Sequence, residues 1–228
     1  PNCSSAKLAE IISLDVDISA RLLRLVNSSF YGLSSKVDTI SRAVTIAGTN
    51  ELRNLILATS AVKSFSGIPE HLVNMDDFWR HAVITGVISQ RLGQLCNSLH
   101  SERLFVAGML HDIGRLAIYL TLPEEATEIL SVTGGDEWTV AEAEERLLGF
   151  THMDVGAALM KHWKLPENLI SVAKNHHHPH EENEAALDVA LIHIALAIAR
   201  GEMAGFSTEE MLWAIEPSAW ESTGLNPE

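Results

Sequence analysis

Apolar residues recur at three- and four-residue steps along nearly the whole chain, and this spacing decides what the chain can fold into. Residues three and four apart share one face of a helix, so each such stretch predicts a helix with one buried face. No stretch alternates apolar and polar residues over the length of a strand, and no Asn-Gly or Asp-Gly pair marks a hairpin. The spacing predicts about ten helices and an all-α fold. Clear examples are AKLAEIISL, ISARLLRLV, ISRAVTIAG and ELRNLILATSAV.

Helix starts and one interruption of the pattern indicate how the chain is organised. Thr139–Glu142 and Ser207–Glu210 have the spacing of a capping box, in which a hydroxyl group and a carboxylate satisfy backbone N–H groups at a helix start. Gly67 and Pro69, within FSGIPEHLVN, interrupt the helical pattern just where the charge balance changes. We therefore expect a smaller N-terminal helical lobe over residues 1–66 and a larger helical lobe over residues 70–228.

The net charge of −14 is carried by the larger lobe. Residues 1–70 contain seven Lys and Arg against six Asp and Glu, whereas residues 71–228 contain nine against twenty-four. A strongly acidic surface repels phosphate backbones, so the larger lobe is not expected to bind nucleic acid. In the smaller lobe, SRAVTIAGTNELRNLILATSA has a helix–Gly–helix pattern with Arg42 and Arg53 nearby. Its helices are mostly apolar, unlike a DNA-recognition helix, so nucleic-acid binding is not expected there either.

The sequence also favours a cytoplasmic protein. No apolar run reaches the roughly 18–20 residues needed to cross a bilayer. The first residues, PNCSSAKLAE, lack the basic and apolar regions of a signal peptide. Cys3 and Cys96 do not have Cys-x-x-Cys spacing and are expected to be reduced.

Histidines and aspartates stand where the apolar pattern leads one to expect core residues. Asp77 and His81 are four residues apart and so share one helix face. Neutral imidazole and carboxylate groups suit zinc, iron, manganese or nickel rather than calcium, and one carboxylate can bridge two such ions. Each group alone also has an ordinary interpretation, as a hydrogen-bonded core histidine or as part of a solvated loop. The other candidates are His111 and Asp112 in AGMLHDIGRL, His152 in GFTHMDVGAAL, and His176, His177 and His178 in KNHHHPH.

The order His, His-Asp, His, His-His resembles the HD superfamily of metal-dependent phosphohydrolases. Within it, LLRLVNSSFYGLSSKVDTISRAVTIAGTNELRNLILATS, LHDIGRL and ERLLGFTHMDVGAALMKHWKLPENLI are similar to the HDOD domain of bacterial signalling proteins. The resemblance implies an HD-like helical bundle with a smaller N-terminal lobe. By similarity to the HD-GYP relatives, it implies Asp77 as an extra ligand. It places His176 and His177 at the family's double histidine, and a shift of the alignment by one residue would bring in His178 instead. The metal ligands that it implies are His81, His111, Asp112, His152, His176 and His177.

Two positions depart from the pattern of the catalytic relatives. Those proteins end the motif with an Ala-Asp step, whereas here Leu196 follows Ala195 and removes an anionic ligand. Asp188 lies eight residues earlier, over two helical turns away, while His193, one turn before, is a possible extra ligand. The relatives also have a phosphate-binding lysine where this chain has Arg115, and their GYP segment is absent.

The sequence therefore carries two functional hypotheses. The first is a regulatory signal-transduction module of the HDOD type, impaired in catalysis, that acts by binding a protein partner or a nucleotide. The second is a phosphohydrolase of a nucleotide or cyclic dinucleotide, with Asp112 and Arg115 as catalytic residues. In both, the cofactor is one or two divalent ions of iron, manganese, zinc or nickel, although the regulatory module could also lack metal.

Overall fold

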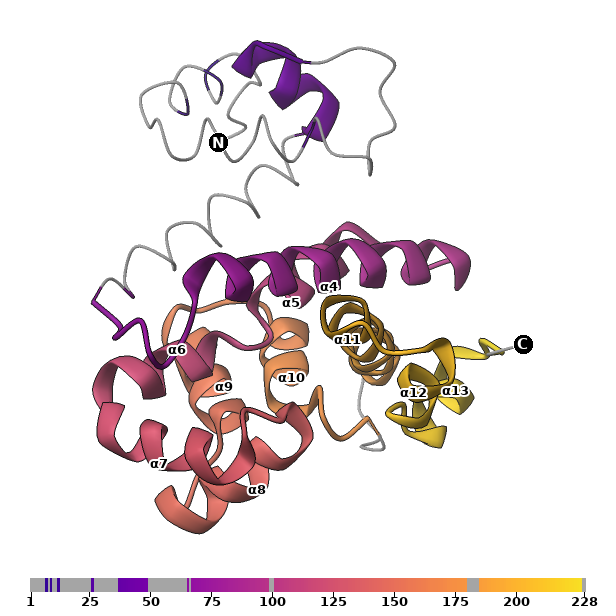
Figure 1. Ribbon diagram of the computed structural model, residues 1–228. Coiled ribbons are helices and arrows are strands. Elements are labelled where there is room, and N and C mark those ends of the chain that lie inside the picture. The colour runs from indigo at the N-terminus through magenta and orange to yellow at the C-terminus, as the bar shows by residue number, and fades with distance from the viewer. Residues whose placement is uncertain are drawn as a thin grey trace. The chain divides into compact units, whose positions relative to one another are not determined.

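The computed structural model describes residues 37–48, 67–98, 101–179 and 185–226, together with single positions before residue 67. The chain divides into two compact units, Pro1–Ser64 and Phe65–Glu228. Every regular element of the described residues is a helix, and none of them forms a strand, which confirms the expected all-α fold (Figure 1). That the units are the two lobes of the related domains stays a prediction.

The first unit is described only in part. Residues 40–48 are helical, and Gly48 has a φ of 82°, a conformation typical of a helix end. Arg42 is exposed on this helix, whereas Arg53 and most of the helix–Gly–helix pattern lie outside the described residues. A small apolar core is formed by Ala9, Ile12, Val26, Val37, Ala43 and Val44.

The second unit contains ten helices among its described residues. Helix α4 packs against α5 and α11, α9 packs against α6 and α10, and α7 packs against α8. The short helices α12 and α13 pack against α11 (Figure 1). The helices are α4 (Met75–Leu95), α5 (Ser101–Leu110), α6 (Ile113–Thr121), α7 (Pro123–Thr133), α8 (Glu137–Leu148), α9 (His152–His162), α10 (Glu167–Asn175), α11 (Ala186–Ala204), α12 (Thr208–Trp213) and α13 (Pro217–Thr223).

The predicted helix starts are right in one case and wrong in another. Ser207–Glu210 forms the expected capping box at the start of α12. Thr139–Glu142 does not, because α8 already begins at Glu137, and the Thr139 hydroxyl instead donates to Asp136. A box that the sequence analysis missed, Thr151–Asp154, begins α9. It fixes the start of the helix that carries His152.

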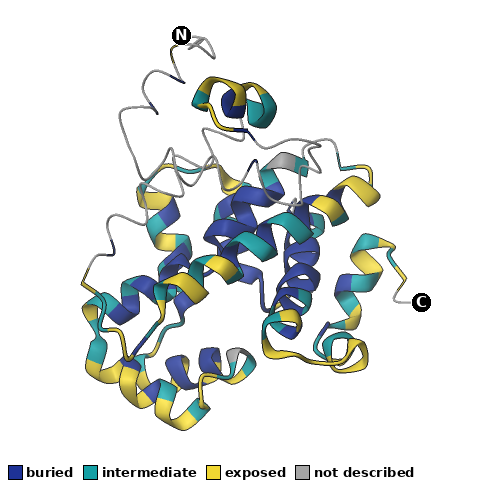
Figure 2. Cartoon of the chain, turned by 45° about the horizontal axis from the view of Figure 1, so that its top comes forward, coloured by how far each residue is buried: buried dark blue, intermediate teal, exposed yellow. Residues whose placement is uncertain are grey.

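The core of the second unit surrounds α11. Twelve residues of this helix are buried, and Figure 2 shows buried positions concentrated in the middle of the unit, with exposed ones at its outside. Helices α4 and α5 approach each other closely at two glycines, Gly86 on α4 and Gly108 on α5. A Cβ on Gly108 would lie 2.6 Å from backbone atoms of Gly86. The absence of side chains at these positions lets the two helices pack backbone to backbone.

One segment, Arg103–Thr121, is long and apolar enough to pass a test for a membrane span. It is not an uninterrupted apolar run, because it contains Arg103, His111, Asp112 and Arg115. The segment comprises most of α5, a turn and α6, and 78% of its most apolar 18-residue window is buried inside the protein. Core helices of globular domains pass the same test, so the finding is weak evidence for a span.

Candidate metal centre

His111 and Asp112 occupy a break between two helices rather than the middle of one. Helix α5 ends at Leu110 and α6 begins at Ile113, so the pair forms the turn between them. Both residues are buried, with exposed fractions of 0% and 4%. The apolar run AGMLHDIGRL conceals this break, because both helices are buried and share the same composition. The turn aims the two polar side chains into the interior.

A second close approach places His152 beside this turn. A Cβ on Gly114, in the first turn of α6, would lie 1.9 Å from the carbonyl oxygen of His152 and 2.6 Å from the backbone nitrogen of Gly156. No side chain fits at residue 114 without moving α9. The glycine therefore allows the start of α6 and the start of α9 to touch, and this contact brings Asp112 close to His152.

The rings of three histidines are oriented in the same way, by a hydrogen bond from Nδ1 to an oxygen atom. A backbone carbonyl or a carboxylate accepts hydrogen bonds but cannot donate them, so a ring nitrogen bonded to one carries the proton. His111 Nδ1 donates to the Gly108 carbonyl at 2.7 Å, His152 Nδ1 to the Glu144 carboxylate at 2.6 Å, and His176 Nδ1 to the Ala173 carbonyl at 3.1 Å. Each Nε2 then has a lone pair, and none of the three has a hydrogen-bond partner among the residues that the structure describes. Metal-binding histidines are commonly oriented in this way.

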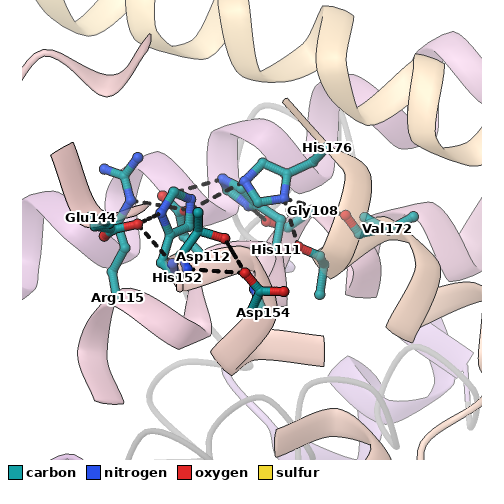
Figure 3. A network of polar contacts seen from close by, with 11 residues as sticks. Gly108, His111, Asp112, Arg115, Glu144, His152, Asp154, Val172 and His176 are labelled. Carbon is teal, nitrogen blue, oxygen red and sulfur yellow. Dashed lines mark hydrogen bonds and ion pairs between the residues drawn. The ribbon is translucent and has the colours of Figure 1, made fainter. Parts of the chain in front are cut away.

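Asp112 lies at the centre of these rings (Figure 3). Its carboxylate oxygens are 3.5 Å from Nε2 of His152, 3.5 Å from Nε2 of His176 and 3.6 Å from Nε2 of His111. Arg115 Nε lies 3.3 Å from the same carboxylate. Burial alone would raise the pKa of Asp112, but the Arg115 guanidinium holds this pKa well below its usual value. The centre therefore presents an anionic oxygen.

Burial favours the neutral form of three of the imidazoles, those of His111, His152 and His177. Burial, with smaller contributions from His176 and His81, lowers the pKa of His111 to about 3 despite the opposing effect of Asp112. Burial likewise lowers the pKa of His152, with a contribution from Arg115. The pKa of His177 lies well below its usual value because of burial and the adjacent His176. Neutral imidazoles are the form that binds a metal ion.

The six ligand positions expected from the sequence lie together in two groups. The first consists of Asp112, His152, His176 and His177, whose ligand atoms lie within 4.8 Å of one another. The second consists of His81, His111 and Asp112, so the two groups share Asp112. Atoms that each bind one tetrahedral ion at about 2.1 Å are roughly 3.4 Å apart, close to the separations from Asp112. The donors therefore fit a divalent ion, although their role as ligands stays a prediction.

The remaining candidates lie elsewhere. Asp77 is exposed in the first turn of α4 and belongs to neither group, and His178 is exposed beyond the double histidine. His193 has both ring nitrogens engaged: Nδ1 donates to the His176 carbonyl at 2.9 Å, and Nε2 accepts from the Glu216 N–H at 3.1 Å. The arrangement does not support His193 as an extra ligand. Leu196, where the resemblance implies a missing carboxylate, is fully buried on α11.

The sequence analysis missed Glu144, whose exposed fraction is 1%. One oxygen of its carboxylate accepts from both the backbone N–H and the Nδ1 of His152, at 2.7 and 2.6 Å. Glu144 therefore fixes the position of His152 and the nitrogen that faces Asp112. A signal was present: Glu144 lies four residues after Val140 and four before Leu148, on the apolar face of α8 rather than its acidic face.

We expect Glu144→Gln to weaken metal binding about 10- to 100-fold, because the amide no longer forces the proton onto His152 Nδ1. Isothermal titration of the metal-free protein with Zn²⁺ measures the change. The exposed Glu128→Gln removes the same charge from α7 and should leave the affinity unchanged. Equal affinities of all three proteins would contradict a role for Glu144 in holding His152.

The two ligand groups together form what we call the cage. The cage consists of His81, His111, Asp112, His152, His176 and His177. The fold and the cage define a class: an all-α domain with a buried histidine–aspartate cluster suited to a divalent metal. Comparison with known proteins gives the family. Residues 1–179 match the HDOD domain, and the chain belongs to the HDOD domain family.

Similar proteins carry regulatory and hydrolytic names. A Geobacter sulfurreducens HDOD protein of unknown function is 25% identical, with a TM-score of 0.81 over 98% of this chain and 76% of its own. A Shewanella amazonensis protein named as a candidate phosphohydrolase is 26% identical, with a TM-score of 0.75 over 99% of this chain and 84% of its own. A Marinobacter aquaeolei protein named as a candidate signal transduction protein has the same fold, at 19% identity and a TM-score of 0.71 over 99% of this chain and 50% of its own.

The curated relatives are longer than this chain. An uncharacterized protein of Treponema pallidum is 26% identical over 187 residues, which make up 81% of this chain. The match spans 36% of that protein, about a third of its length.

Proposed function

We propose that this chain is a regulatory signal-transduction module that holds a divalent transition metal but does not hydrolyse phosphoesters. The observation that carries the proposal is the apolar residue Leu196 at the position where the catalytic relatives resembled by the sequence have an aspartate. Leu196 is fully buried, so neither water nor a polar side chain from the surface takes the place of the missing carboxylate at this position. The cage keeps its imidazoles but lacks this carboxylate.

The neighbouring polar residues of α11 support the proposal because each already has partners. Asp188 is 1% exposed and forms a two-point ion pair with Arg103, at 2.8 and 3.0 Å. His193 uses both ring nitrogens in the hydrogen bonds described above. The remaining acidic residue of the helix, Glu202, is exposed. None of these residues offers a free carboxylate in place of the missing one.

The donor set favours iron, manganese, zinc or nickel, because imidazole nitrogens outnumber carboxylate oxygens. In the proposed module the ion ties together the segments that carry His81, His111, His152 and His176. It then acts mainly as a structural crosslink, and the module acts through a protein partner or a nucleotide. A cytoplasmic location belongs to the same proposal.

The alternative is a metal-dependent phosphohydrolase, and one observation favours it. Asp112 is shared by both ligand groups, the arrangement expected of a carboxylate that bridges two ions. Two such ions would stabilise the attacking and leaving oxygens of a phosphoester. Arg115, beside Asp112 and 11% exposed, would then bind the phosphate.

Two measurements on one untagged sample separate the hypotheses. Elemental analysis gives the metal content, and incubation with a generic phosphodiester and a cyclic dinucleotide in Mn²⁺ or Fe²⁺ gives the activity. We expect about one or two ions per chain and no turnover above a sample of the Asp112→Asn variant. Turnover that is absent from this variant would establish the phosphohydrolase. The absence of any stoichiometric metal would contradict the phosphohydrolase and the proposed metal site, and would leave a regulatory module without metal.

A further inference from the structure

A cleft of about 560 Å³ reaches the cage beside His177. Its walls come from α8, the start of α9, the loop after α10 and the loop before α13. His177 lines this cleft and also belongs to the four-residue ligand group with Asp112, His152 and His176. His177 is 4% exposed, and within the described part of the chain neither of its ring nitrogens has a hydrogen-bond partner. A buried imidazole with two unused nitrogens thus stands between the cleft and the cage.

The rim of the cleft is acidic. Glu142 and Glu145 are exposed and lie three residues apart on α8, so they share one face of the helix. Glu216 adds a third carboxylate, and Arg146 is the one lysine or arginine in the lining. Carboxylates that line a cleft concentrate cations and repel anions. This charge is unsuitable for a phosphate and suitable for a hydrated divalent cation.

The other members of the four-residue group are closed off. His152 and His176 have exposed fractions of 0%, and neither they nor Asp112 line the cleft. An ion that enters from the cleft therefore meets His177 first. Trp138 supports this ring from the cleft wall, with its centroid 5.4 Å away in an edge-to-face arrangement. This contact keeps the imidazole at the boundary between cleft and cage.

We propose that this cleft is the entry route for the metal, in which Glu142 and Glu145 attract a divalent transition-metal cation and His177 is its first ligand. The inference rests on the proposed metal binding and adds to it a path and a kinetic role for two surface carboxylates. It further implies that a phosphate-bearing ligand does not approach the cage from this side.

The test is the rate of Co²⁺ binding to metal-free protein, followed by the visible absorption of bound cobalt in a stopped-flow instrument. The variant Glu142→Gln/Glu145→Gln removes the two carboxylates of the rim. The control Glu125→Gln/Glu128→Gln removes the same charge, at the same spacing, from exposed positions of α7 that do not line the cleft. Both variants and the native protein are also titrated to equilibrium, which gives the cobalt stoichiometry.

At about 10 mM salt we expect the rim variant to bind cobalt about 3- to 10-fold more slowly than the native protein, with unchanged stoichiometry. The control should bind at the native rate, and near 1 M salt the three rates should converge because surface charges are screened. Equal rates at low salt with full stoichiometry would overturn the route alone and point to entry past the partly exposed His81. Equal slowing of the control would also overturn it, and no cobalt binding at all would overturn the metal site itself.

Discussion

Asp112→Asn is expected to abolish stoichiometric metal binding, lowering the affinity by about 100-fold or more. The loss of a group that merely orients a ligand typically costs 10- to 100-fold, and Asp112 would itself be a ligand of both groups. Asparagine has nearly the same shape but no negative charge to offset that of the ion. It also lacks the two equivalent oxygens that face His111 on one side and His152 and His176 on the other. Titration with Zn²⁺ and elemental analysis measure the loss.

The matched control for this variant is Asp76→Asn, an exposed aspartate of the first turn of α4 that belongs to neither ligand group. It removes the same charge from the same unit and should bind metal as the native protein does. Circular dichroism spectra establish that both variants are folded. If Asp112→Asn keeps the native stoichiometry and affinity, Asp112 is not a metal ligand, and the proposed centre with a shared carboxylate is wrong.

Leu196→Asp is expected to make the stability of the protein depend strongly on metal. An uncompensated charge in a core costs about 3–5 kcal/mol, which corresponds to a fall in Tm of roughly 6–20 °C for a chain of this size. If residue 196 faces the cage, a bound divalent cation compensates the new carboxylate, and most of this loss is recovered. The measurement is Tm at pH 7.5, with and without excess Mn²⁺, compared with the metal-induced change in the native protein.

Ile194→Asp provides the control on the same helix. Ile194 is 1% exposed and belongs to the apolar cluster with Ala190, Ala197 and Ile215, beside α13. A carboxylate there has no cage to reach, so its destabilisation should persist with Mn²⁺. If Leu196→Asp also stays destabilised in Mn²⁺, residue 196 does not face the cage. The missing carboxylate then ceases to be an argument against catalysis.

The sequence predicted the helices and the gathering of the histidines for different reasons. Helices such as α11 follow from apolar spacing, which is a local property. The cage needs contacts between segments as distant as His81 and His177, and no local rule gives these. They could be expected because the order of histidines and aspartate resembles a known family, in which the same order accompanies one spatial arrangement.

Glu144 shows where this reasoning stops. It lies between Glu142 and Glu145 in a run that reads as the acidic face of a surface helix. Its spacing from Val140 and Leu148 places it on the apolar face, but only the packing of α8 against α9 reveals that this carboxylate accepts two hydrogen bonds from His152. The break at His111 was concealed for a related reason, because two buried helices and the turn between them share one apolar composition.

The contact between Gly114 and the His152 carbonyl has a consequence for how the cage responds to change. Core side chains of other sizes can be accommodated by altered rotamers, but a spacing set by two backbones in contact has no such adjustable part. Substitutions in the surrounding core should therefore leave the distance between Asp112 and His152 unchanged. If Leu196 stands where a ligand has been lost, as proposed, the rest of the cage can stay in register for this reason, whether or not a reaction still depends on it.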